Sequence, residues 1–129
     1  MTEINNLTSG RIDEGFLKKI VGKVLKKERK LKKDLSIALI GEKRIKELNK
    51  KYRRKNRPTD VLSFSYGDSL GEIIICPQVV RENARRYNLS FKKELGRVLV
   101  HGTLHLLGYN HKKMAKKEDY YLKACQKLI

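Results

Sequence analysis

Short apolar runs of strand length alternate in this chain with longer segments whose apolar residues recur at the helical period. Three runs are typical of strands, and a turn at 67–71 predicts that the last two form a hairpin: Leu35–Gly41, Asp60–Tyr66 and Glu72–Cys76. The helical segments are, in chain order, one capped by Asp13, Glu42–Tyr52, Pro77–Tyr87, one that begins at Ser90, and Met114–Leu128. This alternation predicts an α+β fold with α/β-like features, in which about five helices pack on one small mixed sheet of about four strands.

The length of the chain and its apolar content predict a single folded domain. Its 129 residues match the usual size of one domain, and no internal repeat or low-complexity linker divides them. Apolar residues make up 40% of the chain, which is too many for a disordered protein. We therefore expect residues 1–129 to fold as one unit.

The chain is strongly basic, because 31 lysines and arginines face 14 acidic residues and give a formal net charge of +17. Such a field attracts polyanions, and nucleic acid is the commonest polyanion in a cell. An anionic membrane surface is the competing partner, and lysines that serve only solubility are the simplest alternative. The segments 18–33 and 81–86 carry much of the charge, although a charged helix face is usually only the solvated side.

Neither a membrane span nor a secretion signal is expected. No run approaches the ~18 apolar residues that a span needs, and the first ten residues lack the apolar core of a signal peptide. A secreted disulfide scaffold would usually carry more than the two cysteines found here, Cys76 and Cys125. We therefore expect a cytoplasmic protein in which both thiols are reduced and buried.

The three histidines of the chain, His101, His105 and His111, all fall within one short segment. In a helix, residues four apart stack on one face, so His101 and His105 can point two imidazoles at one ion. Gly108 is placed to end that helix and to let the chain turn back with His111 as a third ligand. Three nitrogen ligands leave one position open on Zn²⁺, the arrangement of catalytic zinc sites. Nickel, copper, cobalt and iron also accept three imidazoles.

This spacing matches the metzincin protease pattern, H-E-x-x-H-x-x-G-x-x-H, at every position except one. Gly102 stands where those proteases carry the glutamate that accepts a proton during peptide hydrolysis. The sequence therefore predicts a metzincin-like helix and turn that hold a metal, and it argues against a protease.

Three segments in the same order extend the pattern: YRRKNRPTDVLSF at 52–64, GEIIIC at 71–76 and HGTLHLLGYNH at 101–111. Together they resemble the YbeY family of bacterial endoribonucleases, also called rRNA maturation factors. The order of the elements agrees over nearly the whole chain. The resemblance implies a metal-dependent RNase that prefers single strands and acts in rRNA maturation, including processing of the 16S rRNA 3′ end, and in ribosome quality control.

The resemblance also implies the site and the partners. The three histidines would form a zinc-type site, and an essential arginine of the family falls on Arg53. Single-stranded rRNA, the small ribosomal subunit and its associated proteins would be the partners, of a chain that we expect to be a monomer. Two residues depart from the family pattern, because Asn110 and Asn56 stand where aspartates are usual. The first departure removes a carboxylate beside a ligand, which can change how that ligand is oriented.

The expected mechanism places Arg53 on the scissile phosphate, where its guanidinium binds two oxygens and stabilises their charge. Asp60 either caps a turn or accepts a hydrogen bond from a histidine, and Glu72 is a conceivable general base. A metallohydrolase of another class, such as an atypical peptidase, and a ribosome assembly factor with a structural metal are the alternatives. Three tyrosines are candidates for base stacking, although we expect more of them to be half-buried packing residues: Tyr52, Tyr66 and Tyr109.

Overall fold

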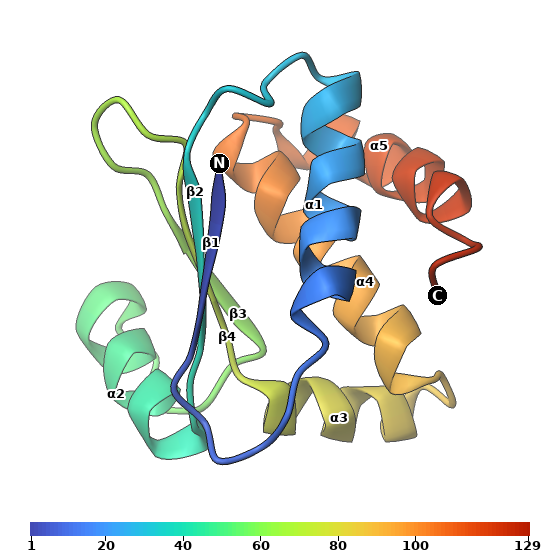
Figure 1. Cartoon of the computed structure of the whole chain (residues 1–129). Coiled ribbons are helices and arrows are strands. Elements are labelled where there is room, and N and C mark those ends of the chain that lie inside the picture. The colour runs from blue at the N-terminus through green and yellow to red at the C-terminus, as the bar shows by residue number, and fades with distance from the viewer.

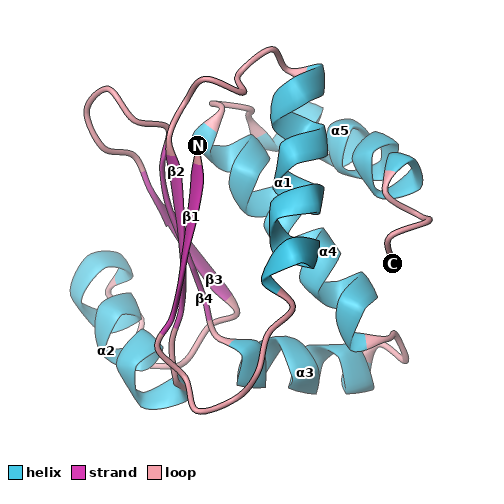
Figure 2. Ribbon diagram, viewed as in Figure 1, coloured by secondary structure: helices cyan, strands magenta, loops and turns pink.

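The computed structural model describes residues 1–129, and Figure 1 shows the arrangement of its helices and strands. The strands are β1 (Thr2–Asn6), β2 (Leu35–Leu39), β3 (Val61–Phe64) and β4 (Gly71–Ile75). The helices are α1 (Glu14–Lys27), α2 (Glu42–Arg53), α3 (Pro77–Arg86), α4 (Phe91–Leu106) and α5 (His111–Ala124). One four-stranded sheet and five helices confirm the predicted α+β class (Figure 2).

The sheet has the strand order β1-β2-β4-β3 and is mixed. The strands β1, β2 and β4 are parallel, and β3 is antiparallel to β4, which confirms the predicted hairpin. In that hairpin Gly71 has a φ of +140°, and a Cβ there would lie 2.2 Å from the carbonyl oxygen of Phe64. Only glycine fits this position, because it has neither the Cβ nor the φ restriction of other residues.

Strand β1 was not predicted as a strand. Its sequence, TEINN, contains one apolar residue and thus has almost no hydrophobic pattern. It forms because its backbone pairs with β2 in register from Thr2 opposite Leu35 to Asn6 opposite Leu39. Backbone pairing of an edge strand requires little from its side chains, so the sequence holds no strong signal for it.

Helices cover both faces of the sheet (Figure 1). On one face, the larger core packs β2 and β4 against α1, α4 and α5, and Leu17, Ile37 and Leu99 are fully buried in it. On the other face, a smaller core packs α2 against the sheet around Ile45 and Ile74. Helix α4 therefore lies between the sheet and the outer helix α5.

The prediction for the last helix was wrong at both ends. It was expected at 114–128, but α5 spans His111–Ala124 and ends at Cys125. Asn110 accepts a hydrogen bond from the backbone N–H of Lys113 and so starts the helix one turn earlier than the apolar pattern indicates. The third histidine is consequently the first residue of a helix and not part of a loop.

Candidate active site

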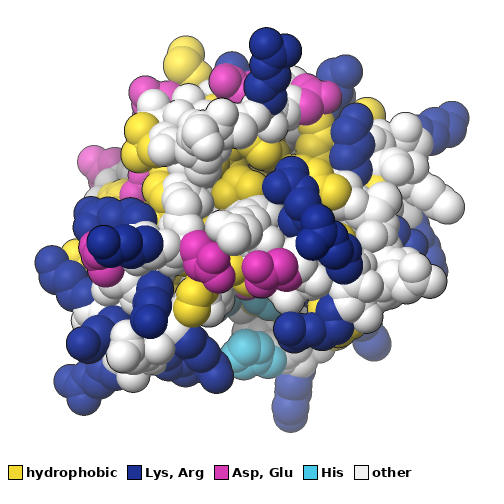
Figure 3. All heavy atoms as spheres, turned by 90° about the horizontal axis from the view of Figure 1, so that it is seen from below, with side chains coloured by type: hydrophobic (Ala, Val, Ile, Leu, Met, Phe, Trp, Pro, Cys, Tyr) yellow, Lys and Arg dark blue, Asp and Glu magenta, His cyan; other side chains and the backbone are white.

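Helix α4 presents two of the histidines on one face. His101 and His105 are four residues apart, and their ring centres are 6.3 Å apart at an interplanar angle of 47°. The side chain of His101 is 36% exposed, and His105 is exposed. Figure 3 shows histidine side chains at the surface, with lysine and arginine side chains on either side of them.

The end of α4 turns the chain toward the third histidine. Gly108 has a φ of +90°, its N–H donates to the carbonyl of His105, and the N–H of Tyr109 donates to the carbonyl of Leu104. These two bonds form the glycine-terminated helix end that the sequence predicted. Asn110 then begins α5 as its N-cap, so His111 follows in its first turn.

The replacement of aspartate by Asn110 has a simple structural reading. The side chain of Asn110 accepts the hydrogen bond of Lys113 at 3.0 Å. Asparagine and aspartate cap helices about equally well. The substitution therefore preserves the helix start that holds His111.

The three histidine side chains do not converge on one point in this structure. No group of three or more His, Cys, Asp or Glu side chains is arranged to hold a metal ion. Two imidazoles bound to one Zn²⁺ at about 2.1 Å would have ring centres about 5 Å apart, closer than the 6.3 Å found for His101 and His105. The donor set and its backbone placement fit a metal, but the rings must rotate to bind one.

Glu118, a residue that the sequence analysis missed, is the hydrogen-bond partner of His101. Its carboxylate is hydrogen-bonded to Nδ1 of His101, and the Glu118 side chain is 20% exposed. Because an ionised carboxylate only accepts hydrogen bonds, Nδ1 is the donor, and in a neutral ring the lone pair is then on Nε2. The available signal was the spacing: Glu118 follows His111 by seven residues, about two helical turns, and shares its face of α5.

Arg53 is the last residue of α2 and lies close to the hairpin strand β3. Its Nη2 donates to the carbonyl oxygen of Ser63 at 3.1 Å, and its guanidinium carbon lies 5.6 Å from the ring centre of Phe64. The pKa of His105 is lowered by partial burial and by the neighbouring charges of His101, Arg53 and His111. The fold thus brings Arg53 near the histidine segment, although it precedes His101 by 48 positions in the sequence.

Two other candidates form no hydrogen bond with a histidine. Asp60 faces Arg97, with 3.8 Å between its Oδ2 and Nη2 of the arginine, and not a histidine. Glu72 accepts hydrogen bonds from the hydroxyls of Ser36 and Tyr66. Side chains alternate along a strand, so Glu72 points to the side of the sheet opposite its neighbour Ile73, which faces α4. The geometry gives no support to Glu72 as a general base.

The tyrosines and cysteines divide between surface and core. Tyr52 and Tyr66 are 51% and 53% exposed, so each is about half-buried, as expected. Tyr109 is partly buried and donates a hydrogen bond to Glu28. The cysteines are both free and buried, as predicted: Cys76 and Cys125.

The basic segments form solvated surfaces. The lysines and arginines of 18–33 and of 81–86 are all exposed. None of the five helices is both long enough and apolar enough to cross a bilayer.

Known proteins are similar to this chain in sequence and in fold. The model of the family described as Endoribonuclease YbeY matches residues 3–127. The Endoribonuclease YbeY of Thermotoga neapolitana is 40% identical over 128 residues, which cover 93% of this chain and 79% of the relative. That of Chlorobium luteolum is 35% identical over 129 residues, which cover 93% of this chain and 94% of the relative.

A solved structure has a similar fold. The solution structure of a protein from Thermotoga maritima superposes with a TM-score of 0.71 at 38% identity and covers 95% of this chain and 87% of that one. The family model spans nearly the whole chain, and the arrangement of elements is shared with a solved relative. This chain therefore belongs to the YbeY family of endoribonucleases.

Proposed function

We propose that residues 1–129 form one metal-dependent endoribonuclease domain that cleaves single-stranded RNA during rRNA maturation, including the 16S rRNA 3′ end. As a member of the YbeY family, the chain is a hydrolase that acts on RNA. The observation that carries the proposal is the family match over residues 3–127. The net charge of +17 supports RNA as the substrate, because phosphate contacts supply much of nucleic-acid affinity. We propose that the protein acts in the cytoplasm and that the small ribosomal subunit and its associated proteins are its partners.

The proposed metal ligands are His101, His105 and His111. A bound Zn²⁺ would supply Lewis acidity at a phosphodiester oxygen. Glu118 supports this assignment, because its bond to Nδ1 of His101 leaves Nε2 as the nitrogen with a free lone pair. The lowered pKa of His105 also favours metal binding, because only a neutral imidazole binds a metal.

Arg53 is proposed to bind the scissile phosphate. Its bond to the carbonyl oxygen of Ser63 uses one N–H of Nη2, so the other guanidinium donors remain for a phosphate. The planar fork of arginine matches two phosphate oxygens and stays charged at any physiological pH. Arg53 would therefore orient the RNA backbone and stabilise negative charge as the phosphodiester is cleaved.

The atypical peptidase receives less support than the ribonuclease. Gly102 is buried against the sheet and has no side chain that could act as the missing glutamate. The third reading, an assembly factor whose metal is only structural, predicts RNA binding without cleavage. Measurements of RNA cleavage distinguish this assembly factor from the proposed ribonuclease.

The experiment compares cleavage of single-stranded and duplex RNA by wild type, His101→Ala and Arg53→Ala after stringent purification. We expect wild type to cut the single strand, and both variants to lose at least about a hundred-fold in rate. Arg57→Ala, an exposed arginine in the following loop, is the matched control and should retain activity. If both site variants cut as well as wild type, the activity belongs to a contaminant and the structural-metal reading holds.

A second measurement tests the metal by itself. Purified wild type should contain close to one transition-metal ion per chain by elemental analysis, and His101→Ala should contain much less. A wild-type protein without stoichiometric metal under replete conditions would remove the basis for the three-histidine site.

A further inference from the structure

We propose that a pocket beside α5 is a nucleotide subsite, which holds one unpaired base of the RNA and its phosphate away from the cleaved bond. The inference rests on the proposed function in that its ligand is a segment of the same RNA strand. The pocket has a volume of about 360 Å³, at the small end of the range for ligand sites. It is lined by two tyrosines and three lysines: Tyr109, Lys113, Lys116, Lys117 and Tyr120.

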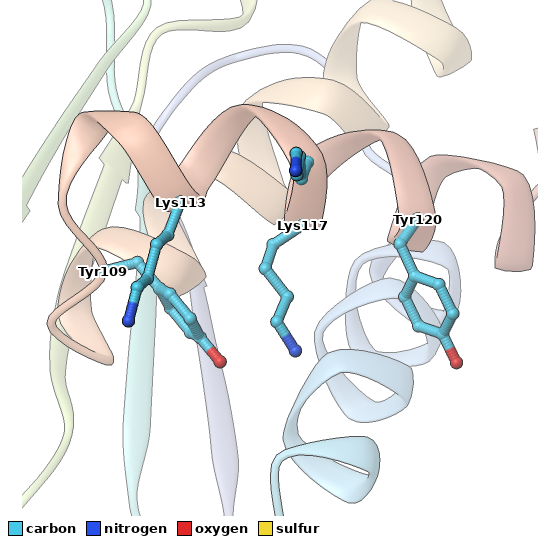
Figure 4. Close-up of a pocket in the computed structure, with 5 residues that line it drawn as sticks. Tyr109, Lys113, Lys117 and Tyr120 are labelled. Atoms are coloured by element: carbon cyan, nitrogen blue, oxygen red, sulfur yellow. The ribbon is translucent and has the colours of Figure 1, made fainter.

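The two tyrosines provide aromatic surface on opposite sides of Lys117. Figure 4 shows Tyr109 and Tyr120 with Lys117 between them, and Lys113 on the side of Tyr109. Tyr120 is 49% exposed, and its ring meets that of Tyr121 edge-on with 5.0 Å between centres. An edge-on neighbour leaves a ring face free, and a nucleobase stacks on such a face whatever its identity.

Contacts with Glu28 and Lys117 fix the position of Tyr109. Its hydroxyl donates to the carboxylate of Glu28, and Nζ of Lys117 lies 5.5 Å from its ring centre. Tyr121 donates to the same carboxylate of Glu28. The floor of the pocket is therefore already ordered before a ligand binds, which lowers the entropic cost of binding.

The charge around the pocket suits a phosphate. No acidic residue lines it. Lys113 and Lys116 are exposed and form no ion pair, so their charges are available to a ligand. Glu28, the carboxylate behind the pocket, is already paired with Lys117 at 3.4 Å. Aromatic surface together with unpaired lysines is the combination by which proteins bind single-stranded nucleic acid.

The position of the pocket on α5 separates it from the histidines. Helical residues advance by about 100° each, so Lys113 and Tyr120 lie about half a turn around α5 from His111 and Glu118. An RNA strand that reaches both places must cross a helix about 10–12 Å wide. The pocket therefore holds a nucleotide that is not next to the cleaved bond. Its contribution to RNA affinity should grow with the length of the RNA.

The experiment measures fluorescence anisotropy with labelled 2′-O-methyl oligouridylates of about twelve and about four nucleotides. We expect Tyr120→Ala to weaken binding of the longer probe about five- to thirty-fold and to reduce the advantage of the longer probe over the shorter one. Tyr120→Phe, which keeps the stacking ring, should bind like wild type. Tyr87→Ala removes a tyrosine that is 57% exposed at the end of α3 and serves as the matched control.

The lysines are tested by salt. The double variant Lys113→Ala with Lys116→Ala should reduce the slope of log K against log salt by about 0.7, the contribution of one phosphate contact to a single strand. Uridine monophosphate in excess should not displace the longer probe, because the strand and not a free nucleotide is the ligand; full displacement would reassign the pocket to free nucleotides.

The outcomes separate this proposal from the proposed function. If wild type cleaves RNA but Tyr120→Ala binds both probes like wild type, the subsite is wrong and the ribonuclease stands. If wild type binds the longer probe through Tyr120 but never cleaves RNA, the subsite stands and the ribonuclease fails. Equal losses in Tyr120→Ala and Tyr87→Ala would mean a general surface effect and would also overturn the subsite.

Discussion

Gly102 of α4 lies directly against Ile73 of β4, where a Cβ on the glycine would be 3.3 Å from Cγ2 of the isoleucine and equally close to Oγ of Ser63. The position is buried and faces the sheet. A glutamate at 102 would have to enter this interface. The departure from the metzincin pattern therefore follows from close helix–sheet packing as well as from a difference in chemistry.

Replacing Gly102 with glutamate should not create a peptidase. A carboxylate forced into the interface would be buried without a partner, and the free energy of unfolding should fall by about 3–5 kcal/mol. Gly22→Ala in α1 is the control, because no atom lies within 4 Å of the added Cβ; it should gain up to about 1 kcal/mol from helix propensity. Urea denaturation measures both. A stable Gly102→Glu protein with peptidase activity would contradict the packing argument.

The partner of His101 should matter for metal affinity. Glu118→Gln removes the carboxylate that fixes the His101 ring, and we expect the affinity for Zn²⁺ to fall about 10- to 100-fold. Competition with a fluorescent chelator measures this directly. Asp119→Asn changes the next residue, whose carboxylate pairs with exposed Lys123 at 3.1 Å, and should leave the affinity as it was. Equal affinities for wild type and Glu118→Gln would limit Glu118 to a structural contact.

Glu28 should make stability depend on acid pH. Burial raises the pKa of its carboxyl, but hydrogen bonds from Tyr109 and Tyr121 and the charge of Lys117 outweigh burial, so the pKa lies below its ordinary value of 4.5. A carboxyl with a lowered pKa stabilises the fold above pH 4.5, and this contribution is lost as the pH falls through the folded-state pKa.

Glu28→Gln should therefore lose about 1.5–3 kcal/mol at neutral pH, the usual range for hydrogen bonds to a charged group. The difference from wild type should shrink below pH 4.5. Thermal unfolding followed by circular dichroism across this pH range checks both points. Glu47→Gln, at a side chain that is 54% exposed, is the control. A difference that stays constant down to pH 3 would show that the charge of Glu28 is not what stabilises the fold.

Arg53→Lys separates charge from geometry at the proposed phosphate site. Lysine keeps the positive charge, so RNA affinity should change by less than about two-fold. It lacks the planar fork, so kcat should fall about 10- to 100-fold. Steady-state cleavage of a single-stranded RNA gives both quantities. Arg54→Lys at the neighbouring position should match wild type, and an equally active Arg53→Lys would mean that charge alone suffices there.

The histidine motif and its helix were predictable because their signals are local. The four-residue spacing of His101 and His105 and the glycine at 108 depend only on helical geometry and on the backbone freedom of glycine. The hairpin of β3 and β4 was equally local, since a short turn joins two apolar runs.

The approach of Arg53, the partner Glu118 and the strand β1 depended on contacts between distant parts of the chain. Nothing near Arg53 in the sequence distinguishes its place beside Ser63 and the histidines from the surroundings of the neighbouring arginines. The bond from Glu118 to His101 exists only because α5 packs on α4. By itself, the sequence determined the local elements, the histidine spacing and the charge, because these are properties of neighbouring residues. Only the tertiary structure decided which charged and aromatic groups meet, because packing brings together residues that the chain keeps far apart.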